Sequence, residues 1–337
     1  MPGVNMPGVN IPGVELRVYR TLAEVPRDFG PSALTIGNFD GVHYGHRQIL
    51  RRVKAVAAEH GWRPSVLTFD PHPTRVVAPG RTPPLLTSPD RRAELMAEEG
   101  IEQVLILPFT ADIAQLSPEE FARQLLVEKL GARAVLVGDN FRFGKAQAGN
   151  VAVLAALGAQ LGFTTEIVAA VTCRGRVVSS SGIRHLIRNG EVGTAARLLQ
   201  HAYALEGAVV SGRGVGSRQT VPTLNLDTAA EVVPAAGVYV TRTRDTGNGR
   251  EWNSITNIGY RPTFGESDER TIETFLLDPL TGDTPARIRV EFLRRVRAER
   301  KFATPEELKS QILRDVRVAQ VFFRRAKAWI GSECTSC

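Results

Sequence analysis

Two histidines three residues apart, His43 and His46, stand in the stretch GNFDGVHYGH (37–46). An apolar run precedes this stretch and a helix-like run follows it, so the histidines are expected at a turn between a strand and a helix. Backbone N–H groups at a helix start favour phosphate, and Gly41 and Gly45 let the backbone approach a ligand closely. Phosphate binding, zinc binding and a plain turn that contains histidines are the alternatives, and for zinc no second cluster of metal-ligand spacing is evident.

The elements around these histidines alternate between short β-branched runs and helical patterns. Serines at 88 and 117 are expected to cap two of the helices, with Glu94 and Glu120 a few residues further on. Such alternation predicts a parallel sheet with helices on both faces, whose ligands bind at the carboxyl ends of the strands. The strands are expected at residues 33–39, 64–70, 103–109, 134–140 and 165–171, and the helices at 47–60, 88–100 and 117–131.

After about Leu205 the strand-like runs follow one another with turns between them and no helices. A long helical pattern, for which Thr304 is a plausible cap, then closes the chain. This order predicts an antiparallel barrel or sandwich with a C-terminal helix. Two domains of different class are therefore expected, over residues 16–198 and 202–332.

Composition narrows the class of protein. The 337 residues carry a formal net charge of +7, which fits anionic small molecules, and no block of like charges indicates a nucleic-acid arm. The three cysteines do not form a disulfide framework, and the CxxC at Cys334 and Cys337 is interpreted as a frayed tail. No apolar stretch is long enough to span a membrane, and the start is not a signal peptide. We expect a cytoplasmic protein, monomeric or weakly homo-oligomeric, that binds neither nucleic acid nor membrane.

Four stretches in the first half resemble sequence motifs of known enzymes and occur in the same order as in one family. GNFDGVHYGH resembles the HxGH phosphate-binding signature of the nucleotidyltransferase superfamily, and three further stretches resemble the bacterial bifunctional riboflavin kinase/FAD synthetase. These are VLTFDPHP (66–73), VGDNFRFG (137–144) and SSSGIRHLI (179–187). The resemblance implies a Rossmann-like, nucleotidyltransferase-type α/β domain that joins FMN to the adenylyl group of ATP and releases pyrophosphate, with Mg²⁺ assisting.

The resemblance also implies roles for single residues. His43, His46 and Arg184 are expected to act on the ATP phosphates as catalytic groups, since a fixed guanidinium suits an oxyanion. Phe69 and Phe143 have core packing as the alternative, and Asp40 and Asp70 have turn capping. The expected ATP-binding residues of this half are Gly37, Phe39, Gly41, Ser180 and Ser181, and the expected flavin-binding residues are Phe69, Asn140 and Phe143.

The second half resembles the riboflavin kinase module of the same family. GAVVSGRGVGSRQTVPTLNLD (207–227) contains a glycine-rich loop, with Gly212 and Gly216 expected at ATP, before a PTxN motif. Thr223 and Asn225 of that motif are expected to bind Mg²⁺–ATP through oxygen atoms. Glu273 matches the carboxylate that accepts the proton of the riboflavin 5′-hydroxyl, and Arg297 lies in a stretch expected near the flavin. An antiparallel barrel that makes FMN from riboflavin is implied.

This module departs from the family pattern at three positions. Thr220 stands where a glycine is usual and Ser217 where an arginine is usual, while Phe275 replaces a common histidine. The main hypothesis is an enzyme that makes FMN and then FAD. Its rivals are an adenylyltransferase with a weak or silent kinase module, a related nucleotidyltransferase with another acceptor, and a non-catalytic RNA-binding protein.

Overall fold

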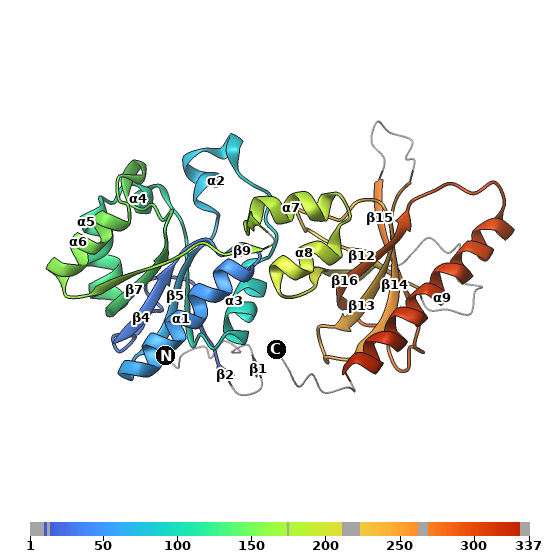
Figure 1. The fold of residues 1–337 in the computed structure, drawn as a ribbon, viewed down its shortest axis with the longest axis horizontal. Helices are drawn as coiled ribbons and strands as arrows, with labels where there is room; N and C mark the ends of the chain where they lie inside the picture. Colours follow the sequence, from blue (N-terminus) through green and yellow to red (C-terminus); the bar gives the residue numbers. More distant parts are fainter. Residues whose placement is uncertain (1–9, 12–13, 174, 211–222, 262–268, 331–337) are drawn as a thin grey trace. The chain divides into compact units, whose positions relative to one another are not determined.

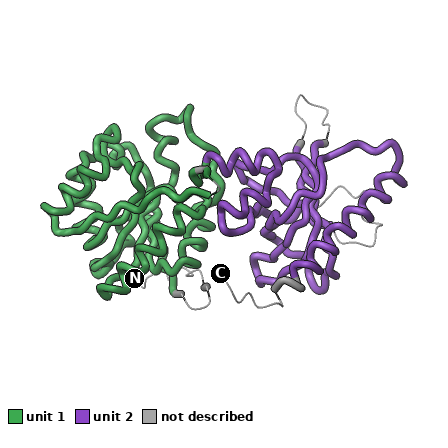
Figure 2. Tube along the Cα trace, in the orientation of Figure 1, with its two compact units in different colours: residues 1–180 green, residues 181–337 purple. Residues whose placement is uncertain are grey.

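The computed structural model describes residues 10–11, 14–173, 175–210, 223–261 and 269–330. The chain forms two compact units, residues 1–180 and residues 181–337 (Figure 2). The first unit is built on a parallel sheet and the second on a closed antiparallel barrel, as the alternation of the sequence patterns predicts. No helix within the described ranges is long and apolar enough to cross a membrane.

The sheet of the first unit has six strands in the order β3-β6-β5-β4-β7-β8, and all its neighbours are parallel. The chain runs outward from β4 through β5 to β6 and then returns to the other side of β4 for β7 and β8. The junction of β4 and β7 is thus the point where the strand order reverses, which is where such sheets bind ligands. The strands are β3 (Arg17–Tyr19), β4 (Ser32–Ile36), β5 (Arg63–Phe69), β6 (Gln103–Leu107), β7 (Ala132–Gly138) and β8 (Thr164–Val168).

Helices cover this sheet on both faces, and each face has its own core. Residues such as Leu50 of α1 and Leu95 of α3 pack on one face, whereas Phe121 and Leu154 pack on the other (Figure 1). The strands are buried on both sides, which explains their near-continuous apolar sequences. The helices are α1 (Tyr44–His60), α2 (Pro73–Val77), α3 (Pro89–Glu98), α4 (Ala111–Gln115), α5 (Pro118–Glu120), a π-helix (Phe121–Lys129) and α6 (Val151–Leu161), with 3₁₀ turns at Pro79–Arg81 and Lys145–Gln147.

The expected helix caps are present. The Ser88 side chain accepts a hydrogen bond from the backbone N–H of Arg91, and Ser117 and Glu120 form a reciprocal capping box. The helix expected over 117–131 differs in type, because after α5 it widens into π turns such as that from Leu130 N–H to the Leu125 carbonyl. Helix α6 is additional: the side chain of Asn150 caps it, and no strand or helix was expected there.

The second unit begins with two helices and continues into the barrel. Six antiparallel strands close in the order β11-β12-β15-β14-β13-β16, so the structure is a barrel and not an open sandwich. The last helix packs Ala319 and Phe323 against Val238, Val240 and Ile255 on the outside of the barrel. The elements are α7 (Ser180–Arg188), α8 (Val192–Leu199), β11 (Tyr203–Val210), β12 (Thr223–Asp227), β13 (Gly237–Asp245), β14 (Glu251–Arg261), β15 (Glu269–Leu276), β16 (Arg287–Ala298) and α9 (Pro305–Ile330).

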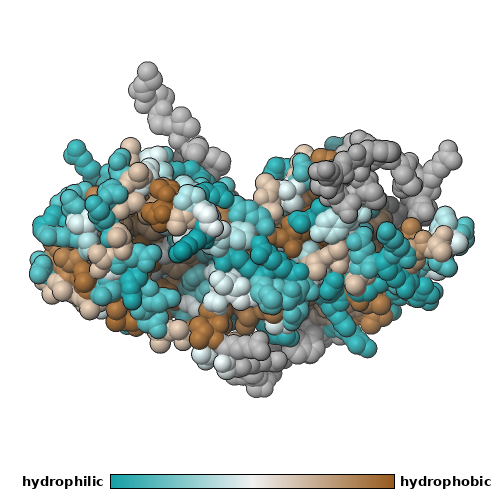
Figure 3. Space-filling view, turned by 90° about the horizontal axis from the view of Figure 1, so that it is seen from above, coloured by the Kyte–Doolittle hydropathy of each residue, from teal (hydrophilic) through white to brown (hydrophobic). Residues whose placement is uncertain are grey.

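Short strand pairs and the surface complete the description. On the face shown in Figure 3, hydrophobic residues lie in small groups among hydrophilic ones. Exposed apolar side chains such as Val77 and Ile167 are ordinary on a protein surface and require no partner. The remaining strands form two short antiparallel pairs, β1 (Asn10–Ile11) with β2 (Val14–Glu15) and β9 (Thr172–Cys173) with β10 (Arg176–Val177).

Candidate active sites

The two histidines lie at the start of α1, directly after β4, as their spacing predicts. The helix begins at Tyr44, two residues before His46, because His43 is its N-cap and accepts a hydrogen bond at Nδ1 from the His46 backbone N–H at 3.4 Å. The two rings stack with centroids 3.6 Å apart. Gly45 leaves room for this, since a Cβ there would lie 3.3 Å from the His43 ring. With Nδ1 accepting, a neutral His43 carries its proton on Nε2, where it can donate to a phosphate oxygen.

His46 is kept neutral by its surroundings. Its Nδ1 is buried and has no hydrogen-bond partner among the described residues. Burial lowers the pKa of His46 well below its ordinary value, and electrostatic interactions with His43 and Arg92 lower it further. The Phe39 ring stands nearly perpendicular to the His46 ring with centroids 5.1 Å apart. His46 is therefore a neutral imidazole on a helix start, where the backbone favours an anion.

The turn that leads to these histidines is strained. Phe39 has a φ of 48°, Gly41 of 82° and Val42 of 40°, although bulky and β-branched residues rarely adopt positive φ. Positive φ at a non-glycine residue such as Phe39 or Val42 costs on the order of 1–3 kcal/mol. It is kept only where the surrounding structure imposes it. Gly37 leaves room for the Phe39 side chain in this conformation, because a Cβ at residue 37 would lie 3.2 Å from the Phe39 ring.

Hydrogen bonds from distant segments hold this turn. The Asp40 carboxylate, only 2% exposed, accepts from the backbone N–H groups of Leu86 at 2.9 Å and Thr87 at 3.2 Å. The Gly41 N–H donates to Thr87 Oγ1 at 3.0 Å, and Ser180 Oγ donates to the Asp40 carbonyl at 2.9 Å. Asp40 thus fastens the turn to a neighbouring loop, a role close to the capping alternative stated for it from the sequence.

Residues of the other first-half motifs follow β5 and β7, the two strands that flank β4. Asn140 is exposed beyond the end of β7, next to the reversal point of the sheet. Phe69 and Phe143 are both buried in the same hydrophobic cluster, and Phe143 stacks on Phe141 with centroids 5.5 Å apart. Core packing therefore accounts for both phenylalanines, and their expected contact with a flavin stays a prediction. His72 Nε2 lies 2.9 Å from Asn38 Nδ2, so it joins the two motif loops.

The SSGIR motif opens α7, as expected. Ser180 is the last residue of the first unit, while Ser181 and Arg184 belong to the second. Arg184 is 8% exposed and donates to Ser181 Oγ at 3.4 Å, so the guanidinium is fixed within its own helix. The prediction that this group acts on the same nucleotide as His43 and His46 remains a proposal.

In the second unit, the expected metal pair and the expected base meet on adjacent strands. Asn225 of β12 is directly opposite Glu273 of β15, and Glu273 is in turn opposite Asn257 of β14. Opposed residues of antiparallel strands project from the same face, with Cβ atoms about 4.5–5.5 Å apart. Thr223 shares this face because it is two residues from Asn225. This face therefore carries the Glu273 carboxylate between two amides, and the Thr223 hydroxyl lies two residues from Asn225 along β12.

The same face explains why Phe275 is tolerated. Phe275 is opposite Thr223, and its ring packs against the apolar cluster that α9 covers with Ala319 and Phe323. An apolar side chain at this position therefore stabilises the docking of the last helix. Arg297, expected near the flavin, also holds α9: its guanidinium lies 2.9 Å from Asp315 and 5.7 Å from the Phe302 ring centroid. Gly212, Gly216, Ser217 and Thr220 lie outside the described residues.

Comparison with known proteins accounts for both units. Residues 25–182 match the family model of FAD synthetase, and residues 199–323 match that of riboflavin kinase. The bifunctional riboflavin kinase/FMN adenylyltransferase of Pseudomonas fluorescens is 36% identical over 85% of this chain and 91% of its own. The chain belongs to the bifunctional riboflavin kinase/FMN adenylyltransferase family. Members from Escherichia coli K12 and Bacillus subtilis are each 33% identical, over 93% and 87% of this chain and 98% and 92% of their own.

A solved structure supports the fold assigned to this riboflavin kinase/FMN adenylyltransferase chain. A protein of Streptococcus pneumoniae, described as a macrolide-efflux protein, has a TM-score of 0.79 at 24% identity and covers 90% of this chain and 98% of that one. This likeness concerns the fold alone. Together with the family matches, it confirms the predicted class: a Rossmann-like parallel domain, then an antiparallel barrel with a C-terminal helix.

Two residues next to the candidate sites were missed from the sequence. Only the strand pairing places Asn257 beside Glu273. Arg92 lies in α3 outside every motif, and its guanidinium contacts the ends of both β4 and β5. An alternating pattern through 255–259 indicates which face Asn257 is on, whereas no local pattern marks Arg92 as buried.

Proposed function

We propose that this chain phosphorylates riboflavin to FMN in its second unit and adenylates FMN to FAD in its first, using ATP in both reactions. The observation that carries this function is the presence of both family matches, in order, in one chain. The expected domains, 16–198 and 202–332, are kept as part of the proposal. The first match ends at residue 182, within α7, and the second begins at residue 199, the last residue of α8.

In the adenylyl transfer, an oxygen of the FMN phosphate attacks the α-phosphorus of ATP and pyrophosphate departs with the electron pair of the broken P–O bond. The attacking phosphate is already ionised, so no general base is required. The first unit must align the two anions and stabilise the charge that develops on the leaving oxygen. Neutral imidazoles of His43 and His46 on a helix start can donate to such oxygens, and we assign Arg184 the same task.

In the kinase reaction, the 5′-hydroxyl of riboflavin must lose a proton as it attacks the γ-phosphorus of ATP. We assign Glu273 as the acceptor of that proton. Its position opposite Asn225 supports this role, because the base then stands beside the group assigned to the nucleotide's metal ion. Asn257 on the other side is placed to fix the carboxylate by an amide hydrogen bond.

Mg²⁺ fits the donor atoms of this face. A hydroxyl from Thr223 and an amide oxygen from Asn225 are hard, neutral ligands, which suits a cation that keeps several waters and binds phosphate oxygens. No group of three or more His, Cys, Asp or Glu side chains within the described residues could hold a metal ion. That finding leaves the zinc alternative at His43 and His46 without further ligands of this kind in the described part of the chain.

Removing the amide should weaken the metal site alone. The Asn225→Ala variant is expected to need about tenfold more Mg²⁺ for half-maximal FMN formation, a change of about 1.4 kcal/mol. The measurement is a Mg²⁺ titration of FMN formation from riboflavin. The Mg²⁺ dependence of FAD formation from FMN, in the same protein, is the control. An equal shift in both reactions would contradict the assignment of Asn225 to the kinase site.

The two activities are tested by supplying the purified protein with Mg²⁺–ATP and either riboflavin or FMN. FAD is expected in both mixtures, with FMN as an intermediate in the first. FAD from FMN alone would mean a silent kinase module, with Thr220 and Ser217 the first positions to restore. FAD in neither mixture would reject the flavin assignment. A monomer or weak homo-oligomer in the cytoplasm, bound to neither nucleic acid nor membrane, remains part of the proposal.

A further inference from the structure

Arg92 is a buried cation bound to backbone oxygens. It lies in α3, is only 1% exposed, and donates from Nη1 to the Asn38 carbonyl at 2.7 Å and to Thr68 Oγ1 at 3.3 Å. Both terminal nitrogens also lie 3.5 Å from the Phe69 carbonyl. Asn38 follows β4, whereas Thr68 and Phe69 end β5. One guanidinium therefore ties together the carboxyl ends of two adjacent strands.

The two strand ends lead into the two motif loops. Asn38 precedes the strained turn that ends at Val42 and delivers His43 to its position. Phe69 precedes the segment that contains His72, whose ring meets the Asn38 side chain. A shift of the Asn38 carbonyl would therefore move the start of the strained turn. The end of the turn is fixed, because His43 caps α1.

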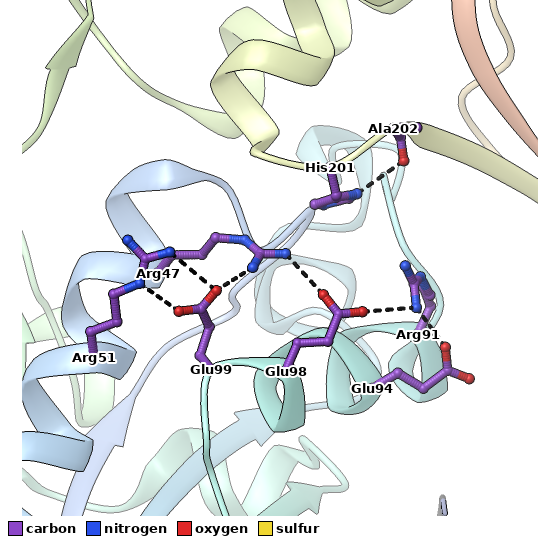
Figure 4. A network of polar contacts seen from close by, with 8 residues as sticks. All are labelled: Arg47, Arg51, Arg91, Glu94, Glu98, Glu99, His201 and Ala202. Atoms are coloured by element: carbon purple, nitrogen blue, oxygen red, sulfur yellow. Dashed lines mark hydrogen bonds and ion pairs between the residues drawn. The ribbon is translucent and has the colours of Figure 1, made fainter. Parts of the chain in front are cut away.

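The bonding of Arg92 differs from that of the other buried arginine between α1 and α3. Arg47 pairs with the carboxylates of Glu99 and Glu98, and Arg51 joins the same network at 2.6 Å from Glu99 (Figure 4). Such pairing is the usual way to offset the desolvation of a buried charge. Arg92 instead uses its donors on carbonyls and a hydroxyl at the motif loops. The Arg47 network thus connects α1 with α3, whereas Arg92 connects α3 with the ends of β4 and β5.

The charge of Arg92 acts on the histidine site as well. Burial lowers the pKa of Arg92, while the carboxylates of Asp40 and Asp70 raise it. Burial lowers the pKa of His46 most, and electrostatic interactions with His43 from its own turn and with Arg92 from α3 lower it further. The guanidinium is thus a fixed cation that disfavours protonation of His46.

We propose that Arg92 is a positioning residue for adenylyl transfer: it locks the turn after β4 to the end of β5 and so sets the geometry of His43 and His46. This inference rests on the proposed function of the first unit. It assigns to Arg92 no contact with the substrates.

The test compares Arg92→Met, which removes the charge and the donors, with Arg92→Lys, which keeps the charge. Arg92→Met is expected to lower kcat for FAD formation from FMN about 10²-fold, the scale of a displacement of about 1 Å in a catalytic group. KM for ATP should stay within about threefold, and Arg92→Lys should recover roughly tenfold of the loss. Arg47→Met, equally buried at the same helix interface, is the matched control and should keep kcat within about threefold. Circular dichroism and the thermal unfolding transition of each purified variant measure whether its first unit is folded, because FMN formation reports on the second unit.

The pH profile separates loss of geometry from loss of charge. In wild type and Arg92→Lys, adenylyl transfer should be nearly constant between about pH 6 and 8, because His46 stays neutral. Burial, the largest cause of the lowered pKa of His46, remains in Arg92→Met, so this variant should lose kcat equally across the range. If Arg92→Met fails to fold, Arg92→Lys alone tests the inference. Its kcat should be lower than that of wild type, and its pH profile should be flat.

Three outcomes would overturn the inference: Arg92→Met within twofold of wild type, Arg47→Met with an equal loss, or a loss in Arg92→Met that is confined to the acid end of the pH range. Loss of FAD formation in the wild-type protein itself would instead reject the proposed function, so the two failures are distinguishable.

Discussion

The Glu273→Gln variant is expected to lose FMN formation from riboflavin by about 10²–10⁴-fold, the usual contribution of a general base. Glutamine keeps the size of the side chain and can still bond to the flanking amides, but it cannot accept the proton of the riboflavin hydroxyl. FAD formation from supplied FMN should remain at the wild-type rate. A chromatographic assay with riboflavin in one mixture and FMN in the other measures both.

The control for this variant is Glu251→Gln. Glu251 begins the neighbouring strand β14 and is exposed, so its charge is removed without change to the face that carries Glu273. This control should leave both activities unchanged. Retention of more than about a tenth of the kinase activity by Glu273→Gln would mean that the proton leaves by another route.

Replacement of His46 with alanine is expected to have the largest effect on the first unit. Removing one preorganised donor from a site of developing charge typically costs about 10²–10³ in kcat. FAD formation from FMN should fall by that factor, and FMN formation from riboflavin should not change. The measurement is the initial rate of FAD formation at saturating ATP, with both reactions followed in the same protein preparation.

A histidine at the other end of the same helix provides the control. His60 is exposed in the last turn of α1 and contacts Trp62, with ring centroids 4.4 Å apart. His60→Ala should leave adenylyl transfer intact. If His46→Ala is also tolerated, the rival of a non-catalytic binding protein gains support, and nucleic-acid binding with a steep salt dependence becomes the next measurement.

The elements were predictable because their local patterns and their tertiary environment agree. Strands β4 to β8 all lie within a few residues of their expected ranges, and Ser88, Ser117 and Thr304 cap helices as their residue types suggest. The pair of Thr223 and Asn225 could also be placed on one face from period two alone. Their alignment with Glu273 could not, because register depends on strand pairing between distant segments.

Neither the positive φ angles of the strained turn nor the burial of Arg92 could be predicted from local sequence patterns, for the same reason. Nothing in the residue types of Phe39 and Val42 suggests positive φ, which arises here from contacts with Leu86, Thr87 and α3. An arginine in the sequence of α3 resembles any solvated helix residue. It becomes buried because carbonyl groups from two other elements receive its donors.

The closure of the second sheet has a consequence for how the chain fails on heating. In the barrel, β11 pairs with both β12 and β16, so its backbone offers little for another molecule to pair with. The sheet of the first unit ends in outer strands, the three-residue β3 and the exposed β8, where the charge of Glu166, bound to Arg52, opposes addition of a further strand. Irreversible aggregation should therefore begin in the first unit, whose sheet has open edges, and adenylyl transfer should be lost before phosphorylation.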